Sequence, residues 1–266
     1  MKPRWALFAT FCLLGGSASA EQYSVAVDLE LVIAVDVSYS MEIDEQRIQR
    51  EGYVNAFRRP EIVRALRRGP LGRIAVTYIE WGGSAVQVVP WTLIDGSGTA
   101  AEFSEMLRQQ PIRRISFTSI SNALAFARKL FQTSPFRGSR RVIDVSGDGP
   151  NNAGVPAPVA RNTTIAQGIV VDGLPIVFTT APDSAAIRDL DVYYQECVIG
   201  GDGAFLLKVT NMSQFAEAIL RKLTIEISGL EVSRRLRRQM GLIQVEYPQP
   251  YNCFIGEEMQ ERSIGK

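Results

Sequence analysis

The chain has 266 residues and a formal net charge of +1. It is long enough to bury a sizeable core, and its charge does not point to nucleic acid or an anionic membrane as a partner. It contains no histidine, which excludes a Ser-His-Asp triad, a histidine general base and a histidine-ligated zinc site.

The first twenty residues have the pattern of a secretory signal peptide. A basic start with Lys2 and Arg4 precedes an apolar run too short to span a bilayer, and small residues end it at Ala18 and Ala20. A membrane anchor is the alternative. We expect residues 1–20 to be removed and the mature chain, near neutral in charge, to be periplasmic or secreted without stable membrane insertion.

Strands and helices are predicted to alternate along the mature chain, from hydrophobic period and from turn residues. The predicted strands cover 29–35, 73–81, 85–94, 140–149, 174–181 and 203–209. The predicted helices cover 44–58, 61–68, 99–110, 118–132, 157–169, 183–198 and 213–227. The helix over 44–58 is expected to bury Ile48, Val54 and Phe57.

This alternation predicts an α/β fold. The sheet is expected to be doubly wound and mostly parallel, with helices on both faces and one antiparallel edge strand formed by a hairpin at Gly82–Gly83. We expect one domain over 21–228. The tail, 229–266, is expected to pack on it, with a short arginine-rich helix at 233–240 that is either a solvated face or a basic partner-binding patch.

Two cysteines, Cys197 and Cys253, remain after the signal peptide is removed. In an oxidising exported compartment an isolated pair most simply forms one disulfide, which would tie the tail to the last third of the domain. Two free buried thiols are the alternative.

Polar residues gather where predicted strands end. Asp36, Ser38 and Ser40 follow the first strand, Thr118 opens the helix at 118–132, and Asp148 follows the strand at 140–149. Ligands of open α/β sheets bind at the carboxyl ends of the strands. Carboxylate and hydroxyl oxygens suit Mg²⁺, with Ca²⁺ or Mn²⁺ as alternatives, and do not suit copper or zinc. Ordinary helix capping by these residues is the competing interpretation.

Asp-x-Ser-x-Ser after the first strand, a threonine at a helix start and an aspartate after a later strand resemble the metal-ion-dependent adhesion site (MIDAS) of von Willebrand factor A (vWA) domains. The wording of "VDLELVIAVDVSYSM", "RVIDVSGDGPNN" and "CVIGGDGAF" is similar to the secreted bacterial DUF1194 family. The resemblance covers roughly residues 28–227.

The resemblance implies direct ligation of a divalent cation by Ser38, Ser40 and Thr118. Asp36 and Asp148 would act mainly through bound water, and a Glu or Asp of a protein partner would complete the shell. In some members of the vWA family a terminal helix moves on ligand binding, and the segment 213–227 would be that helix.

The sequence departs from the family pattern at two places. Tyr39 stands where a small glycine is usual, and "ISF" replaces the glycines common before the threonine. Ser116 and Ser119 are therefore alternatives to Thr118. Asp144 is a carboxylate in an apolar strand, and we expect it either to lie behind the metal or to pair with Arg140 or Arg141.

The function expected from these features is a non-enzymatic binding module that captures an acidic group of a partner through a divalent cation. The first alternative is a metal-dependent hydrolase that uses the same carboxylates. The second is a metal-free scaffold with a vestigial site.

Overall fold

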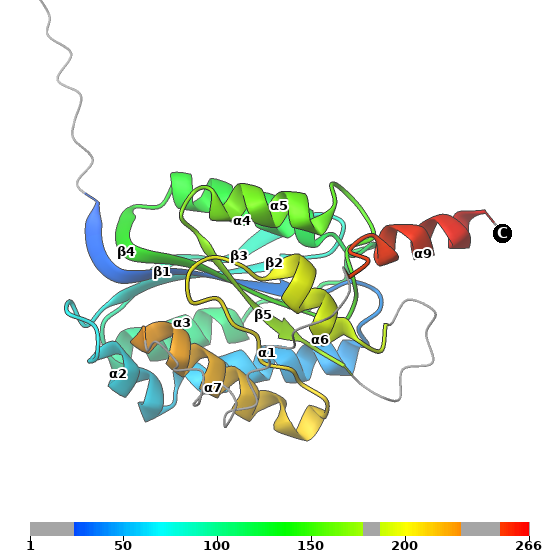
Figure 1. Cartoon of the computed structure of the whole chain (residues 1–266). Coiled ribbons are helices and arrows are strands. Elements are labelled where there is room, and N and C mark those ends of the chain that lie inside the picture. Colours follow the sequence, from blue (N-terminus) through cyan, green and yellow to red (C-terminus); the bar gives the residue numbers. More distant parts are fainter. Residues whose placement is uncertain (1–23, 178–186, 230–250, 266) are drawn as a thin grey trace, which may run out of the picture.

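The computed structural model of the chain describes residues 24–177, 187–229 and 251–265. One five-stranded sheet forms its centre, and helices cover both faces (Figure 1). The strands are β1 (Val25–Asp36), β2 (Ile74–Trp81), β3 (Ala85–Ile94), β4 (Phe136–Gly147) and β5 (Val170–Pro175). The α-helices are α1 (Ile43–Phe57), α2 (Pro60–Leu66), α3 (Ser97–Arg108), α4 (Ile120–Gln132), α5 (Ala157–Ile165), α6 (Leu190–Tyr193), α7 (Phe215–Ser228) and α9 (Ile255–Ile264). A π-helical turn, η1 (Tyr194–Val198), follows α6, and a 3₁₀ turn, η2 (Met212–Gln214), precedes α7.

The strand order is β3-β2-β1-β4-β5. β1 pairs in parallel with both β2 and β4, and β5 pairs in parallel with β4. β3 is the antiparallel edge strand and follows β2 through the predicted hairpin. The chain winds outward from β1 in both directions, so the predicted doubly wound α/β fold is confirmed.

Two apolar cores lie on opposite faces of the sheet. Leu31 and Ile33 of β1 belong to the core beneath α1, α2, α3 and α7, whereas Val32 and Ala34 belong to the core beneath α4, α5 and α6. Figure 1 shows these two helix layers on either side of the sheet. Alternate residues of β1 therefore feed separate cores, which explains why its sequence is apolar throughout.

The last strands differ from the prediction. β5 covers 170–175 instead of 174–181, and residues 178–181 lie outside the described part of the chain. Residues 170–173 belong to neither the predicted helix nor the predicted strand, yet Asp172 and Gly173 are buried in β5, where an Asp172 carboxylate oxygen accepts a hydrogen bond from the Phe205 N–H at 2.9 Å. The segment predicted as a strand at 203–209 forms isolated bridges instead of a strand, from Leu206 to Gly173 of β5 and from Val209 to Ile176 just after it.

The helices are largely as predicted, with one buried position wrong. Val54 and Phe57 are buried in α1, but Ile48 is 43% exposed. The tail contains a helix, α9, that was not predicted, and the helix predicted at 233–240 lies outside the described residues. None of the helices in the described ranges is long and apolar enough to cross a bilayer.

A buried ionic cluster joins α7 to the sheet. Lys222 of α7 contacts Asp144 of β4 at 2.6 Å and also pairs with Glu226 one turn along α7; all three side chains are buried. Of the two expectations for Asp144, pairing with Arg140 or Arg141 is wrong, because Arg140 donates to the Glu226 and Ile227 carbonyls and Arg141 to the Gln167 carbonyl. Asp144 and Lys222 are far apart in sequence, and they come into contact only because α7 packs on the sheet. Their pairing could therefore not be predicted from the sequence.

Removal of the Lys222 ammonium group from this ionic cluster should strongly destabilise the fold. In Lys222→Met, two buried carboxyls lose their counter-charge, and breaking such a pair typically costs about 3–5 kcal/mol. Burial raises the pKa of Asp144 and Glu226, and Lys222 opposes that rise. Without Lys222 the folded state should take up protons as the pH falls, so the loss should be larger at pH 8 than at pH 5. Urea unfolding at both pH values measures it, with Arg221→Met on the same helix as control. Equal stability of the two variants would contradict the prediction.

Candidate metal centre

The candidate site lies where β1 and β4 end side by side. Val35 pairs with Ser146 in the parallel register, so Asp36 and the segment Gly147–Asp148 leave the sheet together. The helix that follows β1 covers one face and the helix that follows β4 covers the other, which makes this edge the point where the winding reverses. Such a point is where open α/β sheets bind ligands.

Four of the five predicted site residues form one connected hydrogen-bond chain. The Ser38 N–H donates to Asp36 Oδ1 at 2.7 Å, the Ser38 and Ser40 hydroxyl oxygens lie 2.8 Å apart, and the Ser40 hydroxyl donates to Asp148 Oδ1 at 2.7 Å. The two serines thus bridge two carboxylates that are 112 positions apart in sequence. The fold brings these oxygens together.

Thr118 enters the same edge from the loop before α4. The Ile115 N–H donates to the Val37 carbonyl at 2.9 Å, which lays this loop beside the Asp36–Ser40 segment. Thr118 is buried, and a Cβ placed on Gly149 would lie 3.9 Å from its hydroxyl oxygen. Ser119, an alternative to Thr118, instead donates its hydroxyl to the Ala153 carbonyl at 2.8 Å and caps α4. Thr118 therefore lies near the segment that carries Asp148, whereas the Ser119 hydroxyl is engaged at the start of α4.

No basic side chain of the described residues forms an ion pair with Asp36. The Asp36 side chain is fully buried, and its Oδ2 atom has no hydrogen-bond partner in the described part of the chain. Burial, followed by the charge of Asp148, raises the pKa of Asp36 well above its ordinary range. A divalent cation at this edge would offset both effects, so the residues present fit a metal ion.

The donors at this edge are hard oxygens. Among the residues that the structure describes, no three histidine, cysteine, aspartate or glutamate side chains gather as a metal cluster. Any metal here would depend on two carboxylates supplemented by hydroxyls, a set that suits Mg²⁺, Ca²⁺ or Mn²⁺.

Gly147 is required by close approach at the base of the site. A Cβ at this position would lie 2.8 Å from Asp36 Oδ2 and 2.8 Å from the Tyr194 hydroxyl, in space that is already filled. The missing side chain lets the β4 backbone pass directly beside the Asp36 carboxylate.

Two asparagines that sequence reasoning did not assign hold the threonine loop in place. Asn152 accepts from the Thr118 N–H at 2.8 Å through its side chain, and its own N–H donates to the Thr118 carbonyl at 2.8 Å. Asn151 accepts from the Ser121 N–H at 3.0 Å. Both follow Asp148 in "GDGPNN", so the segment that supplies one carboxylate also positions the threonine. The paired asparagines after the glycines were the only available signal.

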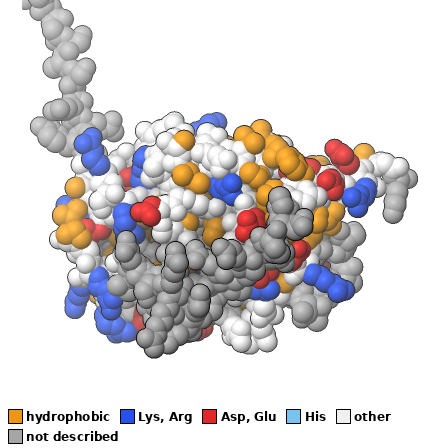
Figure 2. Space-filling view, viewed as in Figure 1, with side chains coloured by type: hydrophobic (Ala, Val, Ile, Leu, Met, Phe, Trp, Pro, Cys, Tyr) orange, Lys and Arg blue, Asp and Glu red, His pale blue; other side chains and the backbone are white. Residues whose placement is uncertain are grey.

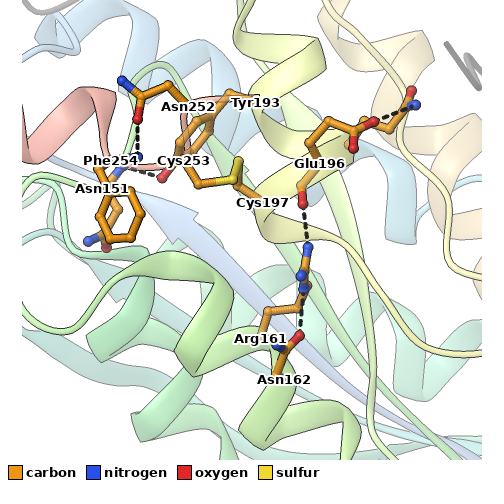
Figure 3. The surroundings of a disulfide bond; sticks show 10 residues. Asn151, Arg161, Asn162, Tyr193, Glu196, Cys197, Asn252, Cys253 and Phe254 are labelled. Carbon is orange, nitrogen blue, oxygen red and sulfur yellow. Dashed lines mark hydrogen bonds between the residues drawn. A yellow bond between two sulfur atoms is a disulfide. The ribbon is translucent and has the colours of Figure 1, made fainter. Parts of the chain in front are cut away.

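The C-terminal segment braces this loop from outside. Cys197 and Cys253 form the predicted disulfide, with a Cα–Cα distance of 5.6 Å, and it anchors the start of α9 beside Asn151 (Figure 3). The Asn151 side-chain amide donates to a Glu257 carboxylate oxygen at 2.8 Å. A Cβ on Gly256 would lie only 2.1 Å from the Asn151 carbonyl oxygen. The start of α9 therefore contacts Asn151, which holds Ser121, and the next residue, Asn152, holds Thr118.

A family comparison matches most of the chain. The family described as "Protein of unknown function (DUF1194)" matches residues 26–231. The chain belongs to this family, as its motifs predicted. No curated protein matches the chain in sequence.

Several solved structures share the fold. The proximal thread matrix protein 1 of the mussel byssus, solved "with zinc occupied MIDAS motif", is 15% identical over 77% of this chain and 49% of that protein, with a TM-score of 0.54. The "von Willebrand factor type A" protein of Catenulispora acidiphila is 14% identical over 76% of this chain and 43% of that protein, with a TM-score of 0.53. The pilus adhesin SpaC of Lactobacillus rhamnosus GG is 12% identical over 76% of this chain and 30% of that protein, with a TM-score of 0.56. This chain spans about half or less of the length of each, and the shared fold is that of vWA domains.

The brace yields a test at Gly256. Replacing glycine by alanine inside a helix normally stabilises it, by up to about 1 kcal/mol. Gly256→Ala should instead destabilise the fold by about 1–3 kcal/mol, because the new methyl group overlaps the Asn151 backbone. The matched control is Gly265→Ala at the other end of α9, where a Cβ makes only an ordinary 3.5 Å contact. Urea unfolding of both variants measures the difference, and equal stability would show that α9 does not press on the site loop.

Proposed function

We propose that this DUF1194-family chain is an exported vWA-type binding module that captures an acidic group of a protein partner through a divalent cation. Ser38, Ser40 and Thr118 would ligate the cation directly. Asp36 and Asp148 would hold its water ligands from the two strand ends. The observation that carries the proposal is the buried Asp36 carboxylate, which lies beside Asp148 with one oxygen unpaired.

A bound cation would keep much of its positive charge, because its hydroxyl ligands are neutral. Hydroxyl oxygens are weak ligands and carry no charge, so a carboxylate brought by another molecule finds an attractive open position. The chain's own residues hold that position still, since Ser38 and Ser40 are linked to both aspartates. The same weak inner shell favours reversible binding over a closed structural site.

Two features support the exported location. The sequence of residues 1–20 has the pattern of a signal peptide, although these residues lie outside the described structure. The Cys197–Cys253 disulfide suits an oxidising compartment such as the periplasm or the cell exterior.

Mg²⁺ is the proposed ion, because the site offers only oxygen donors and few of them.

The proposal predicts that Asp148→Asn changes the stability of the fold in opposite directions with and without metal, relative to the parent chain. Asp148→Asn keeps an oxygen that can accept from Ser40, but removes the negative charge that faces Asp36. Without metal the variant should be at least as stable as the parent. With Mg²⁺ at about a hundred times Kd, the parent should gain about 2.7 kcal/mol and the variant much less. Thermal unfolding in EDTA and in Mg²⁺, Ca²⁺ or Mn²⁺ measures both effects.

The control for this experiment is Asp202→Asn, which removes an exposed carboxylate from a turn between two glycines with positive φ. It should respond to metal as the parent does. If no cation stabilises the parent, the vestigial scaffold replaces the proposal. Hydrolysis of a phosphoester that Asp148→Asn abolishes would favour the hydrolase instead.

A further inference from the structure

We propose that the partner presents its Asp or Glu within a short segment that also carries a large apolar side chain, and that this side chain binds an apolar rim around the metal position. The apolar rim consists of Tyr39, Phe117, Val155 and Phe254. This inference rests on the proposed function and specifies the chemistry of the partner.

The rim residues are unusually exposed for their type. Their side chains are 58%, 54%, 53% and 53% exposed, respectively. In the described ranges of the chain, the three aromatic residues among the exposed large hydrophobics all belong to this rim. Exposed aromatic rings clustered at one edge of a fold mark binding surfaces more often than single scattered apolar residues do.

Two rim residues adjoin the predicted ligands directly. Tyr39 lies between Ser38 and Ser40, and Phe117 precedes Thr118. These two exposed side chains therefore stand on the same loops as three of the predicted ligands. The glycine that is usual at the position of Tyr39 would offer no such side chain.

Phe117 is held exposed at a conformational cost. Its φ of 64° lies in the left-handed region, which a bulky side chain rarely adopts, and such strain is stored mostly at functional sites. The surrounding hydrogen bonds enforce it, since the Gly83 N–H donates to the Ser116 carbonyl at 2.7 Å and the Thr118 N–H to Asn152 at 2.8 Å. The ring gains little burial in return, so folding alone does not explain it.

The other two rim residues come from the braced loop. The Asn151 side-chain amide donates to the Val155 carbonyl at 3.2 Å, which fixes Val155 to the segment after Asp148. Phe254 follows the disulfide cysteine Cys253, and Figure 3 shows its ring beside Asn151. Figure 2 shows hydrophobic side chains gathered over α5 and towards the base of α9. The rim thus combines four chain segments on a fixed scaffold.

Charge at the rim selects an acidic partner. The Arg114 guanidinium lies 4.9 Å from the centre of the Tyr39 ring and donates to the Tyr39 carbonyl at 2.8 Å. Arg114 is exposed, so it adds a positive charge beside the proposed cation. A basic segment would be repelled there, whereas a carboxylate followed by an apolar residue meets the cation, Arg114 and the rings together. The occupant is therefore an acidic-apolar peptide segment of another protein.

Phage-displayed random 12-residue peptides test the inference. The mature full-length chain is panned in Mg²⁺, and bound phage are eluted with EDTA. The eluted sequences should contain Asp or Glu with Phe, Tyr, Leu or Ile within two positions. Acidic sequences without apolar enrichment would overturn the rim and leave the proposed function standing. Absence of EDTA-eluted phage would overturn the proposed function itself, and enrichment of sequences from this chain would assign the rim to a second copy.

Rim variants give the second test, with one selected peptide in synthetic form as the probe. Tyr39→Ala and Phe117→Asn should each weaken peptide binding about tenfold, a change equivalent to about 1.4 kcal/mol, while Mg²⁺ affinity by calorimetry stays as in the parent. Asparagine tolerates the left-handed backbone, so the Phe117 variant should fold. Leu71→Ser, which removes a 47% exposed side chain before β2 at the opposite edge of the sheet, is the control. Peptide affinity unchanged in both rim variants would overturn the proposal.

Discussion

The constraint that organises this molecule is the carboxylate of Asp36, fully buried at a strand end beside a second aspartate. An ionised carboxylate out of water is costly unless it is paired, and a like charge nearby adds to that cost. The chain surrounds it with hydroxyls, a glycine that clears space at Gly147, and a loop held by two asparagines. All of these features shape the site, but none of them supplies a positive charge.

Several other buried acids of the described chain form ion pairs or accept backbone hydrogen bonds. Glu80 pairs with Arg50 and Arg113, and Asp144 pairs with Lys222. Asp28 lacks such a cation but accepts two backbone N–H groups, from Leu71 and Arg73. Asp36 accepts the Ser38 N–H, while its burial and the charge of Asp148 raise its pKa. Asp36 therefore differs from Glu80 and Asp144, because no basic side chain of the described residues forms an ion pair with it.

The sequence predicted the parts of this structure that depend on local pattern, and missed those that depend on contacts between distant segments. The apolar run of β1 and the period of α4 needed no tertiary information, and the Asp-x-Ser-x-Ser segment fell at the predicted strand end. By contrast, Asp172 and Gly173 lie outside the predicted strand, because the buried Asp172 carboxylate has its partner, the Phe205 N–H, some thirty positions later. The pairing of Asp144 with Lys222 and the approach of Gly256 to Asn151 likewise exist only once helices dock on the sheet. Strong local signals identified the candidate ligand residues, whereas the contacts that support them depend on packing.

The buried ionic cluster also bears on how the site can respond to a partner. Asp144 and Asp148 lie four positions apart at the end of β4, so the strand that carries one site carboxylate also carries the anchor of α7. A shift of α7 by one turn, about 5.4 Å, would separate Lys222 from Asp144 while Glu226 moved with it. That movement would leave an unpaired buried carboxylate, at a cost of several kcal/mol. The ionic cluster therefore opposes a movement of α7 by one turn.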